Sequence, residues 1–152
     1  MKVLVMGLPN SGKSTIAREL SYHFLVPHYN ADTLREKCND WDFSYEGRMR
    51  QSYRMSFYDF GIMDFISPLY ETRRIIDADF TIWMDTVENS IYEDTNNLFE
   101  PPDKYDIRVT QHIPLNFLRT NLGMYQQGIE GLREYLYDAR RNDSLLVTKT
   151  RD

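Results

Sequence analysis

The sequence contains a single cysteine, Cys38, in 152 residues. An internal disulfide framework is therefore excluded, and a lone thiol is typical of proteins in a reducing compartment. Histidine is also scarce, because the chain has only His23, His28 and His112, and their spacing is not that of a zinc site. We expect neither a disulfide scaffold nor a structural zinc centre.

Long apolar stretches are absent as well. A helix that crosses a bilayer needs about 18 or more consecutive apolar residues, whereas the N-terminal apolar run, Val3 to Met6, ends at Gly7. This run is also too short for the apolar region of a signal peptide. We therefore expect a soluble, cytoplasmic protein that has no membrane partner.

Basic residues are not in excess. The chain has 18 Lys and Arg against 23 Asp and Glu, which gives a formal net charge of −5. Because contacts to a phosphate backbone come mainly from Lys and Arg, this balance argues against a long nucleic acid as partner. Hydrophobic residues make up 41% and aromatic residues 14% of the chain. This composition suffices for the core of one domain spanning residues 1–152.

Short strand-like segments alternate with helical ones. Val3 to Met6 is a continuous apolar run followed by Gly, which is typical of a strand buried on both faces of a parallel sheet. The alternation predicts a three-layer α/β fold, a five-stranded parallel sheet with helices on both faces. Strands are expected at residues 3–6, 28–31, 62–66, 80–84 and 107–112.

The expected helices are read from periodicity and capping residues. Ile16, Leu20 and Phe24 recur every four positions, the spacing of one helix face. Ser67 is a suitable N-cap with Pro68 at the first helical position. Helices are therefore expected over 13–25, from about 45 to 60, from 68 onward, and over 115–141 with a break near 128–131.

The segment GLPNSGKS, residues 7–14, fits the pattern G-x-x-x-x-G-K-[ST] between an expected strand and an expected helix. Gly7 and Gly12 allow backbone N–H groups to face phosphates at a helix N-terminus. Lys13 can reach the β- and γ-phosphates, and the Ser14 hydroxyl can ligate Mg²⁺. We predict an ATP–Mg²⁺ site in which Lys13 is catalytic. Its predicted nucleotide contacts are Gly7, Pro9, Asn10, Ser11, Gly12, Lys13, Ser14 and Thr15.

An acidic residue follows the second expected strand, in the segment NADTLR at residues 30–35. Small kinases with such a phosphate loop usually have an acidic residue there, opposite the γ-phosphate. Asp32 is therefore predicted to accept the proton of the acceptor hydroxyl, and Arg35 to bind an anionic group of the acceptor. The alternative is that Asp32 only caps a helix through Leu34 and Lys37.

These segments and several later ones resemble the adenylylsulfate kinase family. The segment at 31–35 is similar to the family's Gly-Asp-x-x-Arg, and FISP at 65–68 is identical to a family loop. Arg73 matches an arginine in the helix after that loop. The resemblance covers most of residues 1–113. Its other matches are Asp42-Phe43-Ser44 with Arg48 and Arg54, MDT at 84–86 and FEPPDKYDIRV at 99–109.

The resemblance implies a P-loop kinase fold with strand order 2-3-1-4-5. It also implies transfer of the ATP γ-phosphate to the 3′-hydroxyl of adenylylsulfate, a step of sulfate assimilation. Phe43 would stack on the acceptor's adenine, while Arg35 and Arg48 would bind its phosphosulfate. Ile66 and Ser67 would contact the acceptor through the loop backbone. The acceptor contacts predicted in this way are Asp32, Arg35, Phe43, Arg48, Gln51, Arg54, Phe65, Ile66 and Ser67.

The sequence departs from the family pattern after Asp85, where family members have a basic lid. Residues 75–103 contain eight Asp and Glu but no Lys or Arg. Phosphoryl transfer depends on cations at the developing charge. The missing lid cations would therefore have to be replaced by Arg48, Arg54, Arg119 or a residue of a second subunit. Asp85 itself has two interpretations, orienting water on Mg²⁺ or capping a helix that begins near residue 87.

These departures leave other functions open. The acceptor can be another nucleotide, a small hydroxyl compound or a polynucleotide 5′-hydroxyl. A polynucleotide kinase is suggested by the Asn-x-Asp pattern of Asn30 and Asp32, which such kinases share. The chain can also be a non-catalytic ATP-binding module. A homodimer formed through the C-terminal helical stretch is left open.

Overall fold

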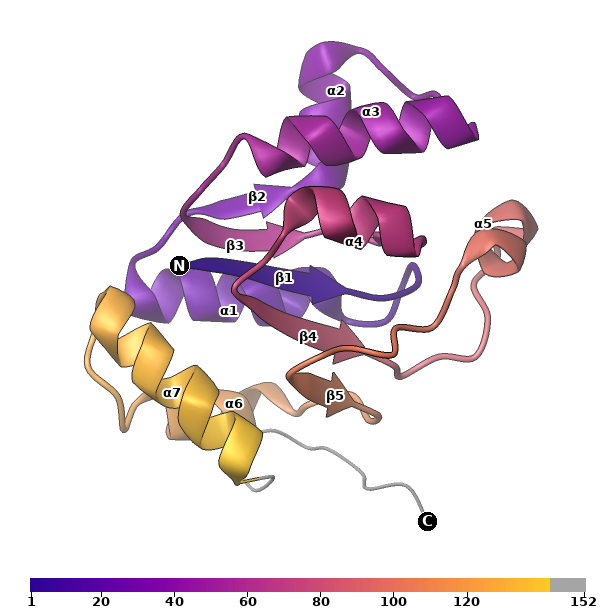
Figure 1. Ribbon diagram of the computed structural model, residues 1–152. Coiled ribbons are helices and arrows are strands. Elements are labelled where there is room, and N and C mark those ends of the chain that lie inside the picture. Colours follow the sequence, from indigo (N-terminus) through magenta and orange to yellow (C-terminus); the bar gives the residue numbers. More distant parts are fainter. Residues whose placement is uncertain (143–152) are drawn as a thin grey trace.

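The computed structural model describes residues 1–142, and a parallel β-sheet lies at its centre (Figure 1). The strand order is β2-β3-β1-β4-β5, and every neighbouring pair is parallel. The α/β class and this order are those predicted from the sequence, and both are confirmed. The strands are β1 (Lys2–Met6), β2 (His28–Asn30), β3 (Gly61–Asp64), β4 (Phe80–Met84) and β5 (Ile107–Val109).

Helices cover both faces of the sheet, and one further helix stands beside the carboxyl ends of the strands (Figure 1). One face is covered by α1 (Lys13–Phe24), α6 (Leu115–Leu122) and α7 (Ile129–Arg141). The other is covered by α2 (Ala31–Cys38), α3 (Tyr45–Ser56) and α4 (Tyr70–Ile76), while α5 (Glu93–Leu98) stands apart. None of these helices, all within residues 1–142, combines the length and apolar character that crossing a membrane requires.

The central strand β1 shows why its sequence is continuously apolar. Val3 and Val5 belong to the core beneath α1, α6 and α7, whereas Leu4 and Met6 belong to the core beneath α3 and α4. All four side chains are at most 1% exposed. Successive side chains of a strand point to opposite faces, so a strand covered on both faces needs apolar residues at every position.

The helix after β3 begins later than predicted. Ser67 is not its N-cap, because the helix starts at Tyr70 and Leu69 occupies the capping position. Ser67 has a left-handed backbone (φ +47°), and its buried hydroxyl lies 3.1 Å from the Thr72 hydroxyl. Thr72 also accepts a hydrogen bond from the Leu69 backbone N–H at 3.1 Å. The FISP segment is therefore a tight loop before α4.

The break in the C-terminal helical stretch is earlier and longer than predicted, since α6 ends at Leu122 and α7 begins at Ile129. Gly128, with φ +93°, is the N-cap of α7. Gly131 lies inside α7, where a Cβ atom would stand 1.7 Å from the carbonyl oxygen of Gln126. This glycine thus permits the connecting segment to approach the helix closely. The helix expected to begin near residue 87 starts only at Glu93, as α5.

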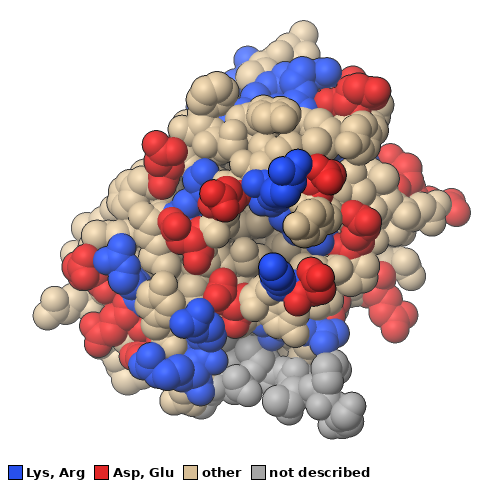
Figure 2. Space-filling model, in the orientation of Figure 1, with Lys and Arg blue, Asp and Glu red and all other residues tan. Residues whose placement is uncertain are grey.

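Charged side chains of both signs are interspersed on the face of the molecule shown in Figure 2. Acidic side chains gather at the edge near α5, whose first turn carries Glu93 and Asp94. No continuous basic band crosses this face of the described residues. This surface agrees with the prediction that the partner is not a long polyanion, and that prediction stays untested.

Candidate functional site

The phosphate loop, residues 7–14, joins the carboxyl end of β1 to the N-terminus of α1. Gly7 has φ +149°, and a Cβ atom there would lie 2.4 Å from the carbonyl oxygen of Met84. Gly12, with φ +98°, is the N-cap of α1. Side chains other than glycine rarely tolerate these backbone angles. The loop therefore needs both glycines, and it directs the N-terminal N–H groups and positive dipole end of α1 toward a bound anion.

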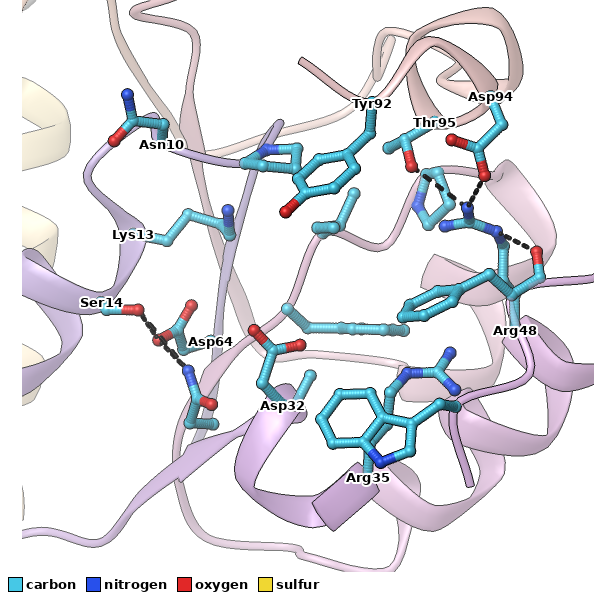
Figure 3. A pocket seen from close by; sticks show the side chains of 18 residues that line it. Asn10, Lys13, Ser14, Asp32, Arg35, Arg48, Asp64, Tyr92, Asp94 and Thr95 are labelled. Carbon is cyan, nitrogen blue, oxygen red and sulfur yellow. Dashed lines mark hydrogen bonds and ion pairs between the residues drawn. The ribbon is translucent and has the colours of Figure 1, made fainter. Parts of the chain in front are cut away.

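Asp64, the last residue of β3, is a site residue that the sequence analysis missed. Its side chain is buried, and its Oδ2 atom accepts hydrogen bonds from the Ser14 hydroxyl at 2.6 Å and the Asn30 amide at 2.9 Å (Figure 3). The Nε2 atom of His28 lies 3.2 Å from the same oxygen. The parallel pairing of β3 with β1 and β2 brings these residues together. The available signal was a carboxylate directly after the apolar pair Ile62-Met63, but the predicted strand 62–66 had placed it inside a strand.

The charges of Lys13 and Asp64 depend on each other. Burial lowers the pKa of Lys13, and the nearby carboxylates of Asp64 and Asp32 oppose this effect. Burial alone would raise the pKa of Asp64, but hydrogen bonds from His28, Ser14 and Asn30, with the charge of Lys13, lower it overall. The Lys13 amino group donates to the Leu8 carbonyl oxygen at 2.9 Å. The loop thus holds a cation beside an ionised carboxylate.

The donor set at this point fits Mg²⁺ bound together with a nucleotide. Within residues 1–142 no group of three or more His, Cys, Asp or Glu side chains is arranged to hold a metal alone. Mg²⁺ in kinase sites is held by one or two protein oxygens together with substrate phosphates and water. Ser14 can supply a hydroxyl ligand while it donates its proton to Asp64. When bound, the ion neutralises charge on the transferring phosphoryl group.

A cavity of about 570 Å³ opens beside the phosphate loop (Figure 3). This volume is within the usual range of small-molecule sites. Asp32 points into the cavity from α2, with Lys13 on one side and Arg35 on the other. The lining residues come from several elements, which meet at this edge because the carboxyl ends of parallel strands lie together. The other lining residues are Pro9, Asn10, Ser14, Asn30, Ala31, Trp41, Phe43, Arg48, Asp64, Phe65, Ile66, Pro68, Tyr92, Asp94 and Thr95.

The structure brings many of the predicted site residues to this one cavity. Of the eight predicted nucleotide contacts, Pro9, Asn10, Lys13 and Ser14 line it. Asp32 is the second residue of α2, and the N-cap is Asn30, whose Oδ1 atom accepts from the Thr33 N–H at 3.0 Å. The alternative that Asp32 is the helix cap is therefore wrong. The predicted acceptor contacts that line the cavity are Asp32, Arg35, Phe43, Arg48, Phe65 and Ile66.

Three predicted acceptor contacts do not line the cavity. Gln51 is fully buried, and its amide donates to the Ala31 carbonyl oxygen at 2.7 Å. Arg54 is paired with Asp40 and donates to the Gln51 side-chain oxygen at 3.1 Å. Ser67 is buried in the FISP loop against Thr72. In this structure, Gln51 and Arg54 anchor the elements behind the cavity.

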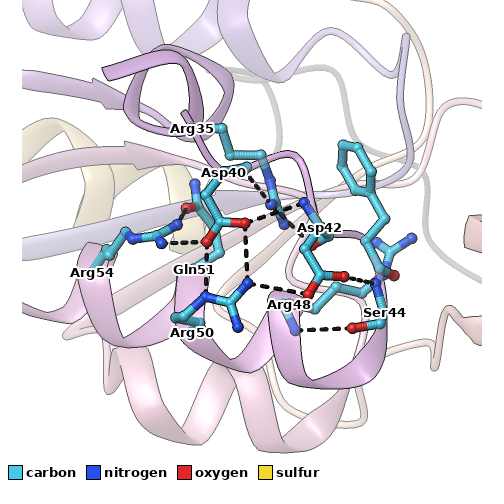
Figure 4. Close-up of polar contacts among 10 residues, drawn as sticks. Arg35, Asp40, Asp42, Ser44, Arg48, Arg50, Gln51 and Arg54 are labelled. Atoms are coloured by element: carbon cyan, nitrogen blue, oxygen red, sulfur yellow. Dashed lines mark hydrogen bonds and ion pairs between the residues drawn. The ribbon is translucent and has the colours of Figure 1, made fainter. Parts of the chain in front are cut away.

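The segment 39–44 forms one wall of the cavity and is held by ion pairs (Figure 4). Arg50 binds Asp40 at 2.8 Å and Asp42 at 3.1 Å. Hydrogen bonds from Arg50 and Arg54 hold the pKa of Asp40 well below its usual range. From the other side, Arg35 donates to the carbonyl oxygens of Asp40 and Asp42 at 3.0 and 3.1 Å. The wall is therefore shaped before any ligand binds.

Asp85, in the acidic segment after β4, does not cap the following helix. This carboxylate is paired with Arg108 at 2.6 Å, and the next helix begins only at Glu93. The capping interpretation of Asp85 is therefore wrong, and the magnesium interpretation stays a prediction. Arg119 is paired with Glu19 at 2.6 Å and does not line the cavity. Of the three arginines considered as replacements for lid cations, Arg48 alone lines the cavity.

No protein-family model and no curated protein sequence matches the chain. Among solved structures, it is similar to an APS kinase of Mycobacterium tuberculosis in complex with AMPPNP and APS. The two are 21% identical with a TM-score of 0.63, over 93% of this chain and 97% of that one.

Two other kinases are similar at lower identity. A shikimate kinase of Aquifex aeolicus is 16% identical with a TM-score of 0.56, over 94% of this chain and 98% of that one. A gluconokinase of Sinorhizobium meliloti is 14% identical with a TM-score of 0.55, over 92% and 91%. Together these likenesses show that the chain has the fold shared by these P-loop kinases.

Proposed function

We propose that the protein is a kinase that transfers the γ-phosphate of ATP to a hydroxyl group of a small, ring-bearing acceptor. The observation that carries this proposal is a single cavity lined by Lys13 and Ser14 at one end and by Asp32, Trp41 and Phe43 at the other. A donor phosphate and an acceptor hydroxyl can meet in such a cavity with a carboxylate between them.

The transfer step follows from these positions. The acceptor oxygen attacks the γ-phosphorus, the bond from that phosphorus to the bridging oxygen breaks, and ADP leaves. The acceptor proton passes to the carboxylate of Asp32. Lys13 lies where its amino group can leave the Leu8 carbonyl and bind phosphate oxygens. Ser14 and Asp64 would hold Mg²⁺ at the phosphates.

Adenylylsulfate is the acceptor that the sequence resemblance suggests, and it would make the protein an enzyme of sulfate assimilation. The identical FISP loop and the likeness to the APS kinase support it. The absence of Lys and Arg from residues 75–103 argues against it. Other members of the proposed acceptor class are nucleosides, other nucleotides and oligonucleotide 5′-ends.

The test is ADP release from ATP–Mg²⁺, measured with each of these acceptors and without any acceptor. We expect one of them to stimulate ADP release, and Lys13→Ala to abolish both ATP binding and turnover. Lys104→Ala, which removes an exposed lysine outside the cavity, is the matched control. Tight ATP binding without stimulation by any acceptor would instead identify a non-catalytic ATP-binding module. Unchanged ATP affinity in Lys13→Ala would refute the phosphate-loop site itself.

A further inference from the structure

The acceptor half of the cavity holds balanced charges. Two arginines, Arg35 and Arg48, and two carboxylates, Asp32 and Asp94, line it. Asp94 comes from α5, in the acidic segment after β4, and its Oδ2 atom lies 3.5 Å from a terminal nitrogen of Arg48. An anionic group brought to Arg48 would therefore also approach the carboxylate of Asp94.

Both arginines are already engaged by the protein. Each is only 4% exposed, and Arg35 donates from one terminal nitrogen to the backbone carbonyls of Asp40 and Asp42. The Nε atom of Arg48 donates to the Phe43 carbonyl oxygen at 2.9 Å. The terminal nitrogen of Arg48 that is paired with Asp94 also donates to the Thr95 hydroxyl at 3.1 Å. Their remaining N–H groups can donate to hydroxyl or carbonyl oxygens of an acceptor, and Asp32 and Asp94 can accept from its hydroxyl protons.

Aromatic side chains supply the rest of this half of the cavity. Trp41, Phe43 and Tyr92 all line it, and each remains 44–54% exposed. The guanidinium carbons of Arg35 and Arg48 lie 4.4 and 5.5 Å from the centre of the Phe43 ring. A base that stacks on Phe43 would thus compete with two cations, whereas Trp41 and Tyr92 offer flat apolar surface for a ring.

We propose that the acceptor is an uncharged nucleoside or nucleoside-like compound, and that Asp94 determines this specificity by neutralising Arg48. The inference rests on the proposed kinase function and narrows its acceptor class. Adenylylsulfate and nucleoside monophosphates carry an anion, whereas the charge of Arg48 is offset by its partner Asp94 and that of Arg35 by Asp32, which lines the same cavity. They are therefore poor acceptors compared with the corresponding neutral compounds.

The experiment compares adenosine, guanosine, cytidine, uridine and thymidine with their 5′-monophosphates and with adenylylsulfate. Acceptor binding is measured by calorimetry with AMPPNP and Mg²⁺ present, and turnover by ADP release. The variants are Asp94→Asn, which removes the carboxylate beside Arg48, and Glu93→Gln, which removes a neighbouring charge on α5 outside the cavity lining.

In the wild-type protein, at least one nucleoside is expected to bind at least about tenfold more tightly than its monophosphate. Asp94→Asn should reduce this preference about two- to fivefold, since the Asp94 side chain is 69% exposed, mainly by improving binding of the monophosphate, whereas Glu93→Gln should leave it unchanged. A wild-type preference for the monophosphate or adenylylsulfate, no binding of any nucleoside, or equal effects of both variants would overturn the inference. Nucleoside binding without ADP release would support the inferred specificity for uncharged compounds and refute the proposed kinase activity.

Discussion

Asp64→Asn tests the assignment of the magnesium and phosphate end of the cavity. The Oδ2 atom of Asp64 accepts hydrogen bonds from Ser14 and Asn30 and contacts His28. Asparagine can present its one carbonyl oxygen at the same place, so the fold should persist while the negative charge is lost. Hydrogen bonds to a charged acceptor contribute about 1.5–3 kcal/mol each, compared with about 1 kcal/mol for neutral ones. We therefore expect the free energy of unfolding to fall by about 1–3 kcal/mol.

The larger effect of Asp64→Asn should be on metal dependence. Replacing a group that orients a metal ligand usually costs about 10–100-fold in metal affinity or activity, which is about 1.4–2.7 kcal/mol. The Mg²⁺ concentration at half-maximal turnover should rise by this factor at constant ATP. Asp59→Asn is the matched control, since Asp59 is exposed and precedes β3 at the opposite end of the strand. An unchanged magnesium titration would refute the role of Asp64 beside Ser14.

Three further predictions concern the same site. Asp32→Asn should lower turnover by about 10²–10⁴ and leave ATP affinity intact, because the proposed base is lost and the phosphate loop is not; a loss below about tenfold would exclude Asp32 as the base. Gly7→Ala should lower the free energy of unfolding by roughly 2–4 kcal/mol, because the added Cβ would lie 2.4 Å from the Met84 carbonyl oxygen and the backbone has a positive φ. Thermal unfolding measures this loss, and an unchanged midpoint temperature would contradict the loop geometry.

The lowered pKa of Asp64 also predicts a pH dependence of stability, which is the last of these predictions. The stability that Asp64 contributes is present above the ordinary Asp pKa of about 3.9 and is lost as the pH falls through the lower folded-state value. In urea titrations between about pH 5 and pH 2, wild type should therefore lose more stability than Asp64→Asn. If stability falls with pH equally in the two proteins, these contacts do not lower the pKa of Asp64.

The sequence alone determined the parts of the site that depend on local chemistry. The phosphate loop is recognisable because Gly7, Gly12, Lys13 and Ser14 act within one strand–turn–helix unit, where spacing along the chain sets their geometry. The continuously apolar β1 indicated a sheet covered on both faces, because a strand buried on both faces needs apolar residues at successive positions. Capping was less predictable, because Ser67 has suitable chemistry but has a left-handed backbone, and its hydroxyl contacts Thr72 within the loop.

Tertiary structure decided which of the polar side chains share the cavity. Arg48 and Arg54 belong to one helix six residues apart, yet Arg48 lines the cavity and Arg54 is paired with Asp40 behind it. The sequence cannot distinguish them, since each would pair with whichever carboxylate the fold brings near. Asp64 joins Ser14 across 50 positions of sequence because β3 lies beside β1. Asp94 reaches Arg48 only through the placement of α5, and long-range charge pairing of this kind depends on distances that no local pattern encodes.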